Sequence, residues 1–196
     1  MAEMKKRLGS SDTFFPIPAA LVVSGTMNKP NIITTAWIGM MSSTPPTVAI
    51  SLRNTRYSLG LIQDSGEFTV NIPPANLFKE VDYCGLVSGR NTNKFEDAGF
   101  TPLKSAVVAT PIIKECPFNM ECKVTGELEL GEWVMILGQI VEAHADADKV
   151  DSSDQRIDID KMNPLVYCAS IREYWELGRK LGNGFSAGKD IVANHE

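Results

Sequence analysis

Three polar stretches that follow one another closely indicate a place where a ligand binds. They cover residues 29–37, 41–46 and 51–58, and they set hydroxyl, amide and guanidinium groups beside two strongly apolar tracts. Polar groups next to a hydrophobic core are costly unless they find partners. Ligand pockets combine an apolar wall with a few polar groups in this way. The pattern therefore predicts a binding site formed by residues 29–58.

The third stretch has the groups that an anion requires. A helix is predicted over residues 54–63, and Arg53, Arg56 and Ser58 surround its first turn. Free backbone N–H groups and the helix dipole favour an anion such as phosphate at a helix N-terminus. The candidates for the N-cap of this helix are Asn54 and Thr55.

The first two stretches have the groups that a planar ring requires. Trp37 offers an aromatic wall, and the hydroxyl groups of Thr35, Ser42 and Ser43 offer hydrogen bonds to the edge of a ring. Taken alone, each residue has a plainer interpretation as a core aromatic or a solvated side chain. Their order along one short region favours a cofactor that carries both a ring and a phosphate.

The elements that must position these residues are mostly strands. β-branched content and alternation predict them, and proline pairs end several of them. Gly131 and Glu132 turn one long hairpin, in which Gly138 permits a bulge. Many strands with few short helices favour a closed or partly closed β-barrel. The predicted strands cover residues 20–25, 47–52, 67–72, 119–130, 133–143 and 164–170, and two further short helices cover 75–83 and 94–97.

Length and composition describe one ordinary globular domain. The 196 residues predict a single domain over 1–196 with short flexible ends, and 43% of them are hydrophobic. The net charge of −5 argues against a nucleic-acid partner, and no apolar stretch is long enough to cross a membrane. Two histidines are too few for a metal or catalytic site built on several of them. Because no secretory signal is recognised at the N-terminus, we expect a cytoplasmic protein.

Three further features have interpretations that involve no site. The four cysteines contain no C-x-x-C pair, so we expect reduced, mostly buried thiols and no metal. The acidic segment 146–160 fails the pattern of a calcium-binding loop and is interpreted as a solvated insertion. The glycine-rich segment 177–188 is expected to pack tightly or to cross to a partner chain.

An ordered series of motifs resembles the flavin reductase-like, FMN-binding split-barrel family, and within it the flavoredoxin branch. The resemblance runs from about Lys5 to Asp190. The motifs that carry it are PNIITTAW, SSTPP, VAISLRNTRYS, GEFTVNIP, GLVSGRNTNKF and AGFT, followed by ECKV, GEWVMILGQIVEA and LGRKLGNGF.

The resemblance implies a mainly β protein, a six-stranded antiparallel split barrel, with a tightly bound, non-covalent FMN. It further implies a homodimer with FMN sites near the subunit interface. This chain departs from some flavoredoxins at Ser42 and Ser43, where cysteines can occur. The residues implied to surround the FMN are Asn31, Thr35, Trp37, Ser42, Ser43, Ser51, Arg53, Tyr57, Ser58, Lys94 and Tyr167.

The implied activity is that of an oxidoreductase whose bound FMN passes electrons to an acceptor. The donor is NAD(P)H or a reduced electron-transfer protein, and no side chain is expected to act as a nucleophile or general base. Three alternatives stay open. They are an FMN-binding electron carrier without NAD(P)H turnover, a split-barrel binding protein without flavin, and an oxidase of a pyridoxine phosphate, which the TTAW and GEFTVNI runs disfavour.

Overall fold

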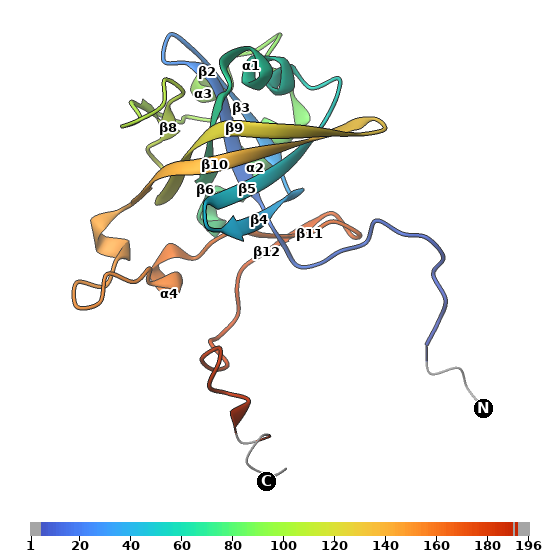
Figure 1. Ribbon diagram of the computed structural model, residues 1–196, viewed down its shortest axis with the longest axis vertical. Coiled ribbons are helices and arrows are strands. Elements are labelled where there is room, and N and C mark those ends of the chain that lie inside the picture. Colours follow the sequence, from blue (N-terminus) through green and yellow to red (C-terminus); the bar gives the residue numbers. More distant parts are fainter. Residues whose placement is uncertain (1–4, 190, 192–196) are drawn as a thin grey trace.

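A computed structural model describes residues 5–189 and 191, and its centre is one antiparallel sheet curled into a barrel (Figure 1). Each neighbouring pair of its strands is antiparallel. In hydrogen-bonded order the strands are β3 (Lys29–Thr35), β2 (Ala20–Thr26), β6 (Glu67–Ile72), β9 (Phe118–Leu130), β10 (Trp133–Ala145), β5 (Pro46–Arg53) and β4 (Ile38–Ser43).

Smaller elements cover the barrel. A three-stranded sheet joins β1 (Ile17–Pro18), β11 (Val166–Cys168) and β12 (Glu173–Trp175), and β7 (Pro102–Leu103) pairs with β8 (Ile112–Ile113). The helices are α1 (Tyr57–Ser65), α2 (Phe78–Leu86), α3 (Lys94–Asp97) and α4 (Ile159–Met162), with 3₁₀ turns η1 (Ala75–Leu77) and η2 (Ala147–Lys149).

The architecture confirms the mainly β barrel with a few short helices. The main sheet has seven strands where six were expected. A six-stranded core is compatible with it, because β4 is an edge strand that pairs only with β5. None of the described helices is both long and apolar enough to cross a membrane.

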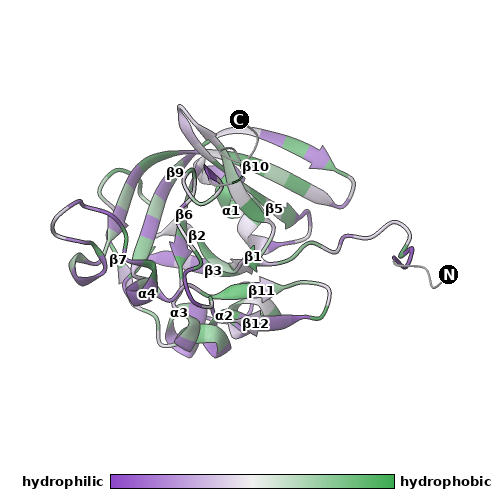
Figure 2. Cartoon of the chain, turned by 90° about the horizontal axis from the view of Figure 1, so that it is seen from below, coloured by the Kyte–Doolittle hydropathy of each residue, from purple (hydrophilic) through white to green (hydrophobic). Residues whose placement is uncertain are grey.

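Two apolar clusters share strand β2. Ala20 and Val22 face the barrel interior, whereas Leu21 and Val23 face the layer formed by α2, α3 and the β11–β12 hairpin. A strand covered on both faces has no polar side, so the run from Ala20 to Val23 is apolar throughout. Strands with one solvated face alternate in hydropathy instead (Figure 2). The layer that covers β2 and β3 brings α2 and the hairpin close to the polar stretch of β3.

The β9–β10 hairpin packs against the core at Gly138, the glycine at which a bulge was predicted. The register between β9 and β10 shifts at this residue. A Cβ atom there would lie 2.4 Å from Cζ of Phe68, which is fully buried. Only a residue without a side chain fits, so the expectation of a bulge at Gly138 is confirmed.

Some element boundaries differ from the prediction. The helix expected over 54–63 begins at Tyr57, with Arg56 as its N-cap, and no side chain caps it. The prediction of Asn54 or Thr55 as N-cap is wrong, because the Arg56 N–H bonds the Arg53 carbonyl in a turn that prolongs β5. The predicted strand 164–170 forms a strand only over β11, with an isolated bridge from Pro164 to Pro74, and the helix expected over 75–83 begins as η1. Strands β3 and β4 were missed, because their polar residues were assigned to a ligand.

The segments interpreted as solvated or tightly packed have different outcomes. Segment 146–160 is mostly exposed, as expected, and no metal-binding cluster is found in the described part of the chain. Segment 177–188 is exposed along its length and leaves the body of the protein, so tight packing on its own subunit is wrong (Figure 1). The N-terminal residues 5–16 extend away in the same manner.

The four cysteines are free thiols, and three of them are buried. Burial raises the pKa of Cys84 and of Cys122 to about 12, and it raises the pKa of Cys116 as well. Thiols that stay protonated are poor nucleophiles. These three cysteines therefore behave as core residues.

Candidate functional site

Two adjoining cavities lie where β3 and β5 meet α2 and the β11–β12 hairpin. The first, of about 320 Å³, we call the aromatic cavity. The second, of about 180 Å³, we call the cationic cavity. Ile33 and Arg56 line both, so the two cavities lie side by side. Polar or aromatic side chains that line the aromatic cavity are Thr34, Thr35, Trp37, Ser51, Arg53, Arg56, Asp82, Trp133, Tyr167 and Tyr174. Those of the cationic cavity are Asn31, Thr55, Arg56, Tyr57, Ser58, Ser88, Arg90 and Lys94.

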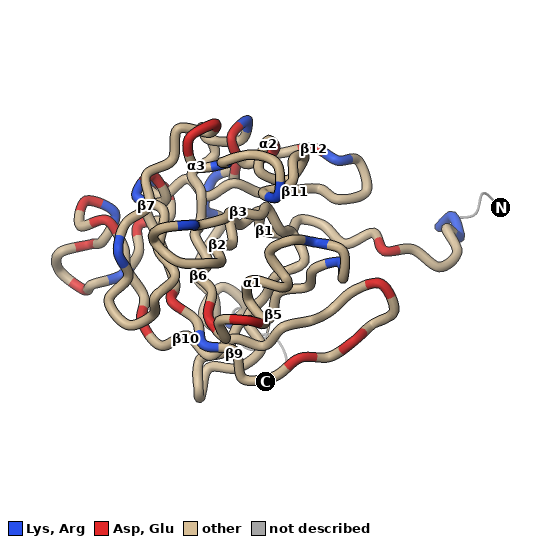
Figure 3. Tube along the Cα trace, turned by 90° about the horizontal axis from the view of Figure 1, so that it is seen from above, with Lys and Arg blue, Asp and Glu red and all other residues tan. Residues whose placement is uncertain are grey.

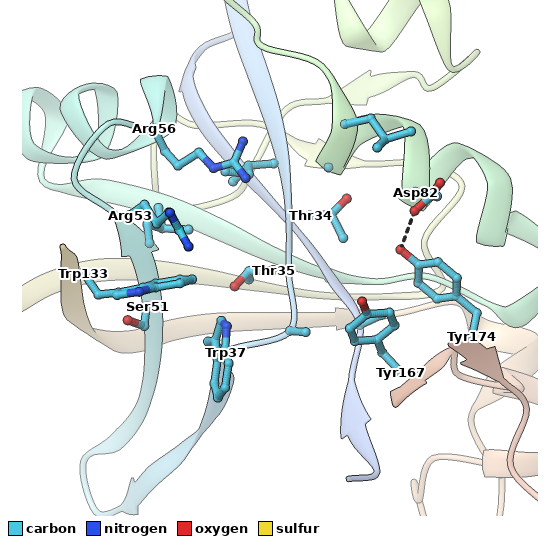
Figure 4. Close-up of a pocket in the computed structure, with 16 residues that line it drawn as sticks. Thr34, Thr35, Trp37, Ser51, Arg53, Arg56, Asp82, Trp133, Tyr167 and Tyr174 are labelled. Carbon is cyan, nitrogen blue, oxygen red and sulfur yellow. Dashed lines mark hydrogen bonds between the residues drawn. The ribbon is translucent and has the colours of Figure 1, made fainter. Parts of the chain in front are cut away.

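One side of the aromatic cavity is a pair of tryptophans with an arginine. Trp37 and Trp133 meet edge to face, with ring centroids 6.0 Å apart and an interplanar angle of 72° (Figure 4). The guanidinium of Arg53 lies 5.3 Å from the Trp133 ring centroid and 3.6 Å from a carboxylate oxygen of Glu132. Trp133 stands opposite Arg53 in the β10–β5 register, so strand pairing builds this side.

The other side consists of two tyrosines and an aspartate. Tyr167 of β11 and Tyr174 of β12 face each other with ring centroids 5.0 Å apart. The Tyr174 hydroxyl donates to Oδ1 of Asp82 on α2 at 3.1 Å (Figure 4). Burial, and then the charge of Asp82, raise the pKa of Tyr174. The phenol therefore stays protonated and joins the hairpin to α2.

Strand β3 forms the base of the aromatic cavity, between its two sides. The Thr34 hydroxyl donates to the carbonyl of Val81 on α2, and Thr35 is buried. Gly85 of α2 lies against Thr34, where a Cβ atom would come within 3.4 Å of the threonine Cβ. Small residues at this contact let α2 approach the strand and close the base.

The cationic cavity concentrates positive charge. Arg56, Arg90 and Lys94 line it, and no Asp or Glu is found among the described residues around it. Elsewhere Lys and Arg are scattered among Asp and Glu (Figure 3). The Arg90 guanidinium lies 5.3 Å from the Tyr57 ring centroid and donates to the Thr55 carbonyl at 3.2 Å. Such a cavity suits an anion.

Asn31 and Gly89 form the base of the cationic cavity. The Asn31 side chain is buried and donates from Nδ2 to the Ser58 hydroxyl at 2.7 Å. Its Oδ1 atom is buried without a hydrogen-bond partner. A Cβ atom on Gly89 would lie 1.8 Å from this oxygen, so the loop after α2 approaches Asn31 only because residue 89 is glycine. An unpartnered buried acceptor beside a cavity fits a site that a hydrogen-bond donor of a ligand completes.

Lys94 is buried at the inner end of the cationic cavity. Its ammonium donates to the carbonyls of Ile32 at 2.8 Å and Cys84 at 2.6 Å. Burial lowers the pKa of Lys94 to about 8, although nearby Cys84 opposes this shift. No carboxylate pairs with Lys94 among the described residues. A buried cation without a countercharge favours an anionic ligand beside it.

The N-terminus of α1 opens toward the same cavity. Tyr57 and Ser58, its first two residues, line the cavity, and no side chain caps the first turn. The first N–H groups of a helix have no intrahelical partner unless a tighter turn supplies one. Here the Leu59 N–H bonds the Arg56 carbonyl at 3.1 Å, so Tyr57 and Ser58 are the residues whose N–H groups could add neutral donors to the three cations.

The structure brings nine of the eleven predicted site residues to the two cavities and leaves two outside. Ser42 and Ser43 line neither cavity, because they lie at the exposed end of the β4–β5 hairpin, where the Ser42 hydroxyl accepts the Thr44 N–H at 3.1 Å. In this subunit the two serines therefore lie outside both cavities, and their place at the edge of a ring stays a prediction. The nine that line the cavities are Asn31, Thr35, Trp37, Ser51, Arg53, Tyr57, Ser58, Lys94 and Tyr167.

Other lining residues were not recognised in the sequence. Gly89 and Arg90 stand inside the motif GLVSGRNTNKF, whose second glycine was the available signal. Trp133, Asp82 and Tyr174 had no local signal, because strand pairing and the packing of the β11–β12 hairpin bring them to the cavity.

Comparisons with known proteins agree with the fold. The family model "Flavin reductase like domain" matches residues 12–176. Flavoredoxin of Desulfovibrio vulgaris (Miyazaki F) is 34% identical, with a TM-score of 0.89 over 94% of this chain and 100% of that chain. A flavoredoxin from Methanosarcina acetivorans is 29% identical, with a TM-score of 0.87 over 95% of this chain and 99% of that chain.

A curated relative of unassigned function shows the same relationship. An uncharacterized protein of Archaeoglobus fulgidus is 37% identical over 141 residues, which are 71% of this chain and 79% of that protein. The family model, the solved structures and the barrel geometry point to one conclusion. The chain belongs to the flavin reductase-like family and has its split-barrel fold.

Proposed function

We propose that the protein is an FMN-binding oxidoreductase of the flavoredoxin type. The phosphate of FMN would bind in the cationic cavity and the flavin ring in the aromatic cavity. The observation that carries the proposal is that a cavity lined by three cations lies beside an aromatic cavity, because FMN joins a phosphate to a planar ring. Solved structures of FMN-binding proteins from Thermus thermophilus and Shewanella baltica share the fold, at 17–19% identity.

The residues present fit the cofactor on three observations. Arg56, Arg90 and Lys94 supply the positive charge that a phosphate requires. The buried Oδ1 atom of Asn31 has no hydrogen-bond donor, and a ribityl hydroxyl would supply one. The combined cavities are of the size that small-molecule sites have, about 300–1,000 Å³.

The protein's own groups would bind, orient and shield the cofactor. Bound FMN supplies the chemistry of electron and hydride transfer. Lys94 and Arg56 would offset negative charge, and the N–H groups of Tyr57 and Ser58 would hold the phosphate. Trp37 and Trp133 form a wall that limits access of water to one side of the ring. None of these steps needs a side chain as a nucleophile or general base.

The electron donor would be NAD(P)H or a reduced electron-transfer protein. The specific alternative is an electron carrier that does not turn over NAD(P)H. Anaerobic mixing of the FMN-loaded protein with NADH and with NADPH separates them. Loss of the visible flavin absorbance supports the reductase, whereas an unchanged spectrum with reduction by dithionite supports the carrier.

The working unit would be a homodimer in the cytoplasm. An apolar groove of about 350 Å³ borders the aromatic cavity and shares Trp37 with it; it also contains Phe14, Ile17, Met41 and Met135. Met41 and Phe14 are 56% and 70% exposed in the single subunit. A second subunit covering this groove would place the interface beside the flavin ring. Free thiols, three of them buried, fit a reducing compartment.

The binding proposal is tested by comparing FMN with riboflavin, which lacks the phosphate. Flavin-free protein is titrated with each, and the quenching of flavin fluorescence gives the dissociation constant (Kd). We expect FMN to bind at least about a hundredfold more tightly, because charge-assisted hydrogen bonds to phosphate are each worth about 1.5–3 kcal/mol.

A matched pair of variants locates the phosphate. Arg90→Ala removes a lining cation and is expected to raise the Kd for FMN about tenfold while leaving that for riboflavin unchanged. Arg156→Ala removes an exposed arginine that pairs with Asp154 far from both cavities, and it should change neither constant. Equal affinity of the parent protein for FMN and riboflavin would contradict the placement of the phosphate.

A further inference from the structure

The two sides of the aromatic cavity carry opposite charge. Arg53 and Arg56 lie on the side of Trp133, and Asp82 lies on the side of the two tyrosines (Figure 4). Arg53 is already engaged, because it stacks on Trp133 and faces Glu132. No Lys or Arg of the described residues forms an ion pair with Asp82. The free charge at the tyrosine side is therefore negative.

The tyrosine side is held in a fixed arrangement. Tyr167 and Tyr174 pack against the apolar cluster that contains Leu165 and Val81, and their rings are tilted by 46°. Because the Tyr174 hydroxyl donates a hydrogen bond to Oδ1 of Asp82, the carboxylate is oriented beside the rings. The other carboxylate oxygen stays available, since Asp82 is exposed.

Two aromatic rings and an oriented carboxylate select a particular chemistry. Aromatic faces attract a cation through the ring quadrupole, and they attract a planar ring by stacking. A carboxylate adds Coulomb attraction for positive charge and repels anions. A planar ring that carries a delocalised positive charge satisfies all three groups at once, whereas an anionic ring meets repulsion at Asp82.

We propose that Tyr167, Tyr174 and Asp82 form a subsite for a planar aromatic cation beside the flavin. The proposal rests on the proposed function, because the subsite lies in the cavity assigned to the flavin ring. It adds that a ligand which binds next to the flavin is preferred when it is positively charged. Asp82 sets this preference, and the tyrosines supply the surface on which the ring lies.

The test uses two probes of nearly equal shape on the FMN-loaded protein. 1-Methylquinolinium carries a positive charge, and 2-methylquinoline is neutral at mildly alkaline pH. Binding is followed through the change in the flavin absorption spectrum and, independently, by calorimetry. We expect the cation to bind more tightly than the neutral probe. We expect Asp82→Asn to raise the Kd for the cation about fivefold or more, while the Kd for the neutral probe changes less than about twofold.

Three comparisons make the result specific. Glu173→Gln removes a carboxylate from the same hairpin but outside the cavity. Glu173 there accepts a hydrogen bond from the Trp175 indole N–H at 3.2 Å. This variant should change the affinity for neither probe. Tyr174→Phe keeps the ring and the charge of Asp82, so the cation should still bind within about threefold. The anion 2-naphthoate should bind more weakly than the cation to the parent protein.

Several results would overturn the subsite. One is that Asp82→Asn lowers the affinity for both quinoline probes equally. Another is that Tyr174→Phe lowers the affinity for the cation as much as Asp82→Asn does. The third is that the parent protein binds 2-naphthoate more tightly than the cation. Loading with FMN is measured first in every variant. Absence of FMN binding in the parent protein would contradict the proposed function, whereas FMN binding without charge preference would contradict the subsite alone.

Discussion

Residue 89 decides how closely the loop after α2 approaches the base of the cationic cavity. The backbone of Gly89 lies against Oδ1 of Asn31, where any side chain would collide. The same amide group holds Ser58 at the start of α1. One contact between a glycine and an asparagine thus joins the loop, strand β3 and the helix N-terminus around the proposed phosphate.

Gly89→Ala is expected to raise the Kd for FMN about tenfold or more. The new methyl group would overlap Asn31 and push the loop outward, and overpacking of this kind costs about 1–3 kcal/mol. Fluorescence titration measures the affinity, and thermal unfolding reports stability. Gly60→Ala is the control, because nothing lies within 4 Å of a Cβ on this helical residue, and it should leave FMN affinity unchanged. Parental affinity in Gly89→Ala would show that the loop takes no part in binding.

Lys94 predicts a dependence of FMN affinity on pH. Its pKa is about 8 in the flavin-free protein because burial disfavours the charged form. A bound phosphate favours the charged form, so its binding raises this pKa and takes up a proton above about pH 8. Between about pH 7 and 8, where the phosphate of FMN is already doubly charged, the Kd for FMN should therefore be nearly constant, and it should rise as pH increases above about 8, up to about tenfold per unit.

The control for this prediction removes the titrating group. Lys94→Met should flatten the rise in Kd, and riboflavin should show no comparable rise with the parent protein. The variant also leaves the carbonyls of Ile32 and Cys84 without their donor, so we expect it to be less stable by about 1–3 kcal/mol. An equally steep rise in Lys94→Met would assign the proton to another group.

At the scale of elements, a buried carboxylate joins strand β9 to the loop between β7 and β8. Glu121 is completely buried and accepts the backbone N–H groups of Ala106, Val107 and Val108 at 2.6–2.9 Å. The His144 ring lies 2.6 Å from the same carboxylate. Burial opposes ionisation, yet these hydrogen bonds together lower the pKa of Glu121.

Glu121→Gln is expected to destabilise the protein by about 2–4 kcal/mol near neutral pH, because an amide cannot accept this set of donors. The pKa of Glu121 is lower in the folded state. Its contribution is therefore present above the unfolded pKa and is lost as pH falls through the folded one. Urea unfolding at several acidic pH values should give a flatter profile for the variant. The control Glu142→Gln, at an exposed residue of the same hairpin, should keep the parental profile.

At the scale of the whole molecule, segments 5–16 and 177–188 extend from the barrel (Figure 1). An apolar groove lies open beside the aromatic cavity. Leu181 and Phe185 are almost fully exposed in the single subunit. Apolar patches of this kind mark association surfaces. The proposed homodimer would bury the groove, and its subunit interface would then lie next to the flavin ring.

Met41→Glu is expected to shift the dimer toward monomers, because it places a charge in the apolar groove. Sedimentation velocity over a range of protein concentrations measures the shift, which we expect to be about tenfold or more in the dimer dissociation constant. Met27→Glu adds the same charge at a comparably exposed methionine outside the groove and should leave association unchanged. A parental dimer in Met41→Glu would place the interface elsewhere.

Local signals predicted most of the strands and part of the site. The apolar run of β2, the alternation of β9 and β10, and the glycine at 138 are properties of neighbouring residues, so the sequence displays them directly. Strand β3 was missed because local signals were also misleading there. Its polar residues resemble those of a ligand-binding loop, although Asn31 and Thr35 do line the cavities.

The sequence by itself determined that this is one acidic, histidine-poor barrel with a polar, ligand-like region around residues 29–58. Only the tertiary structure decided which distant residues complete that region. Strand pairing sets Trp133 beside Arg53, and packing of the β11–β12 hairpin sets Tyr174 beside Asp82. The same pairing leaves Ser42 and Ser43 outside both cavities. The physical reason is that periodicity reports which face of an element is buried, whereas pairing and packing between distant segments decide what that face meets.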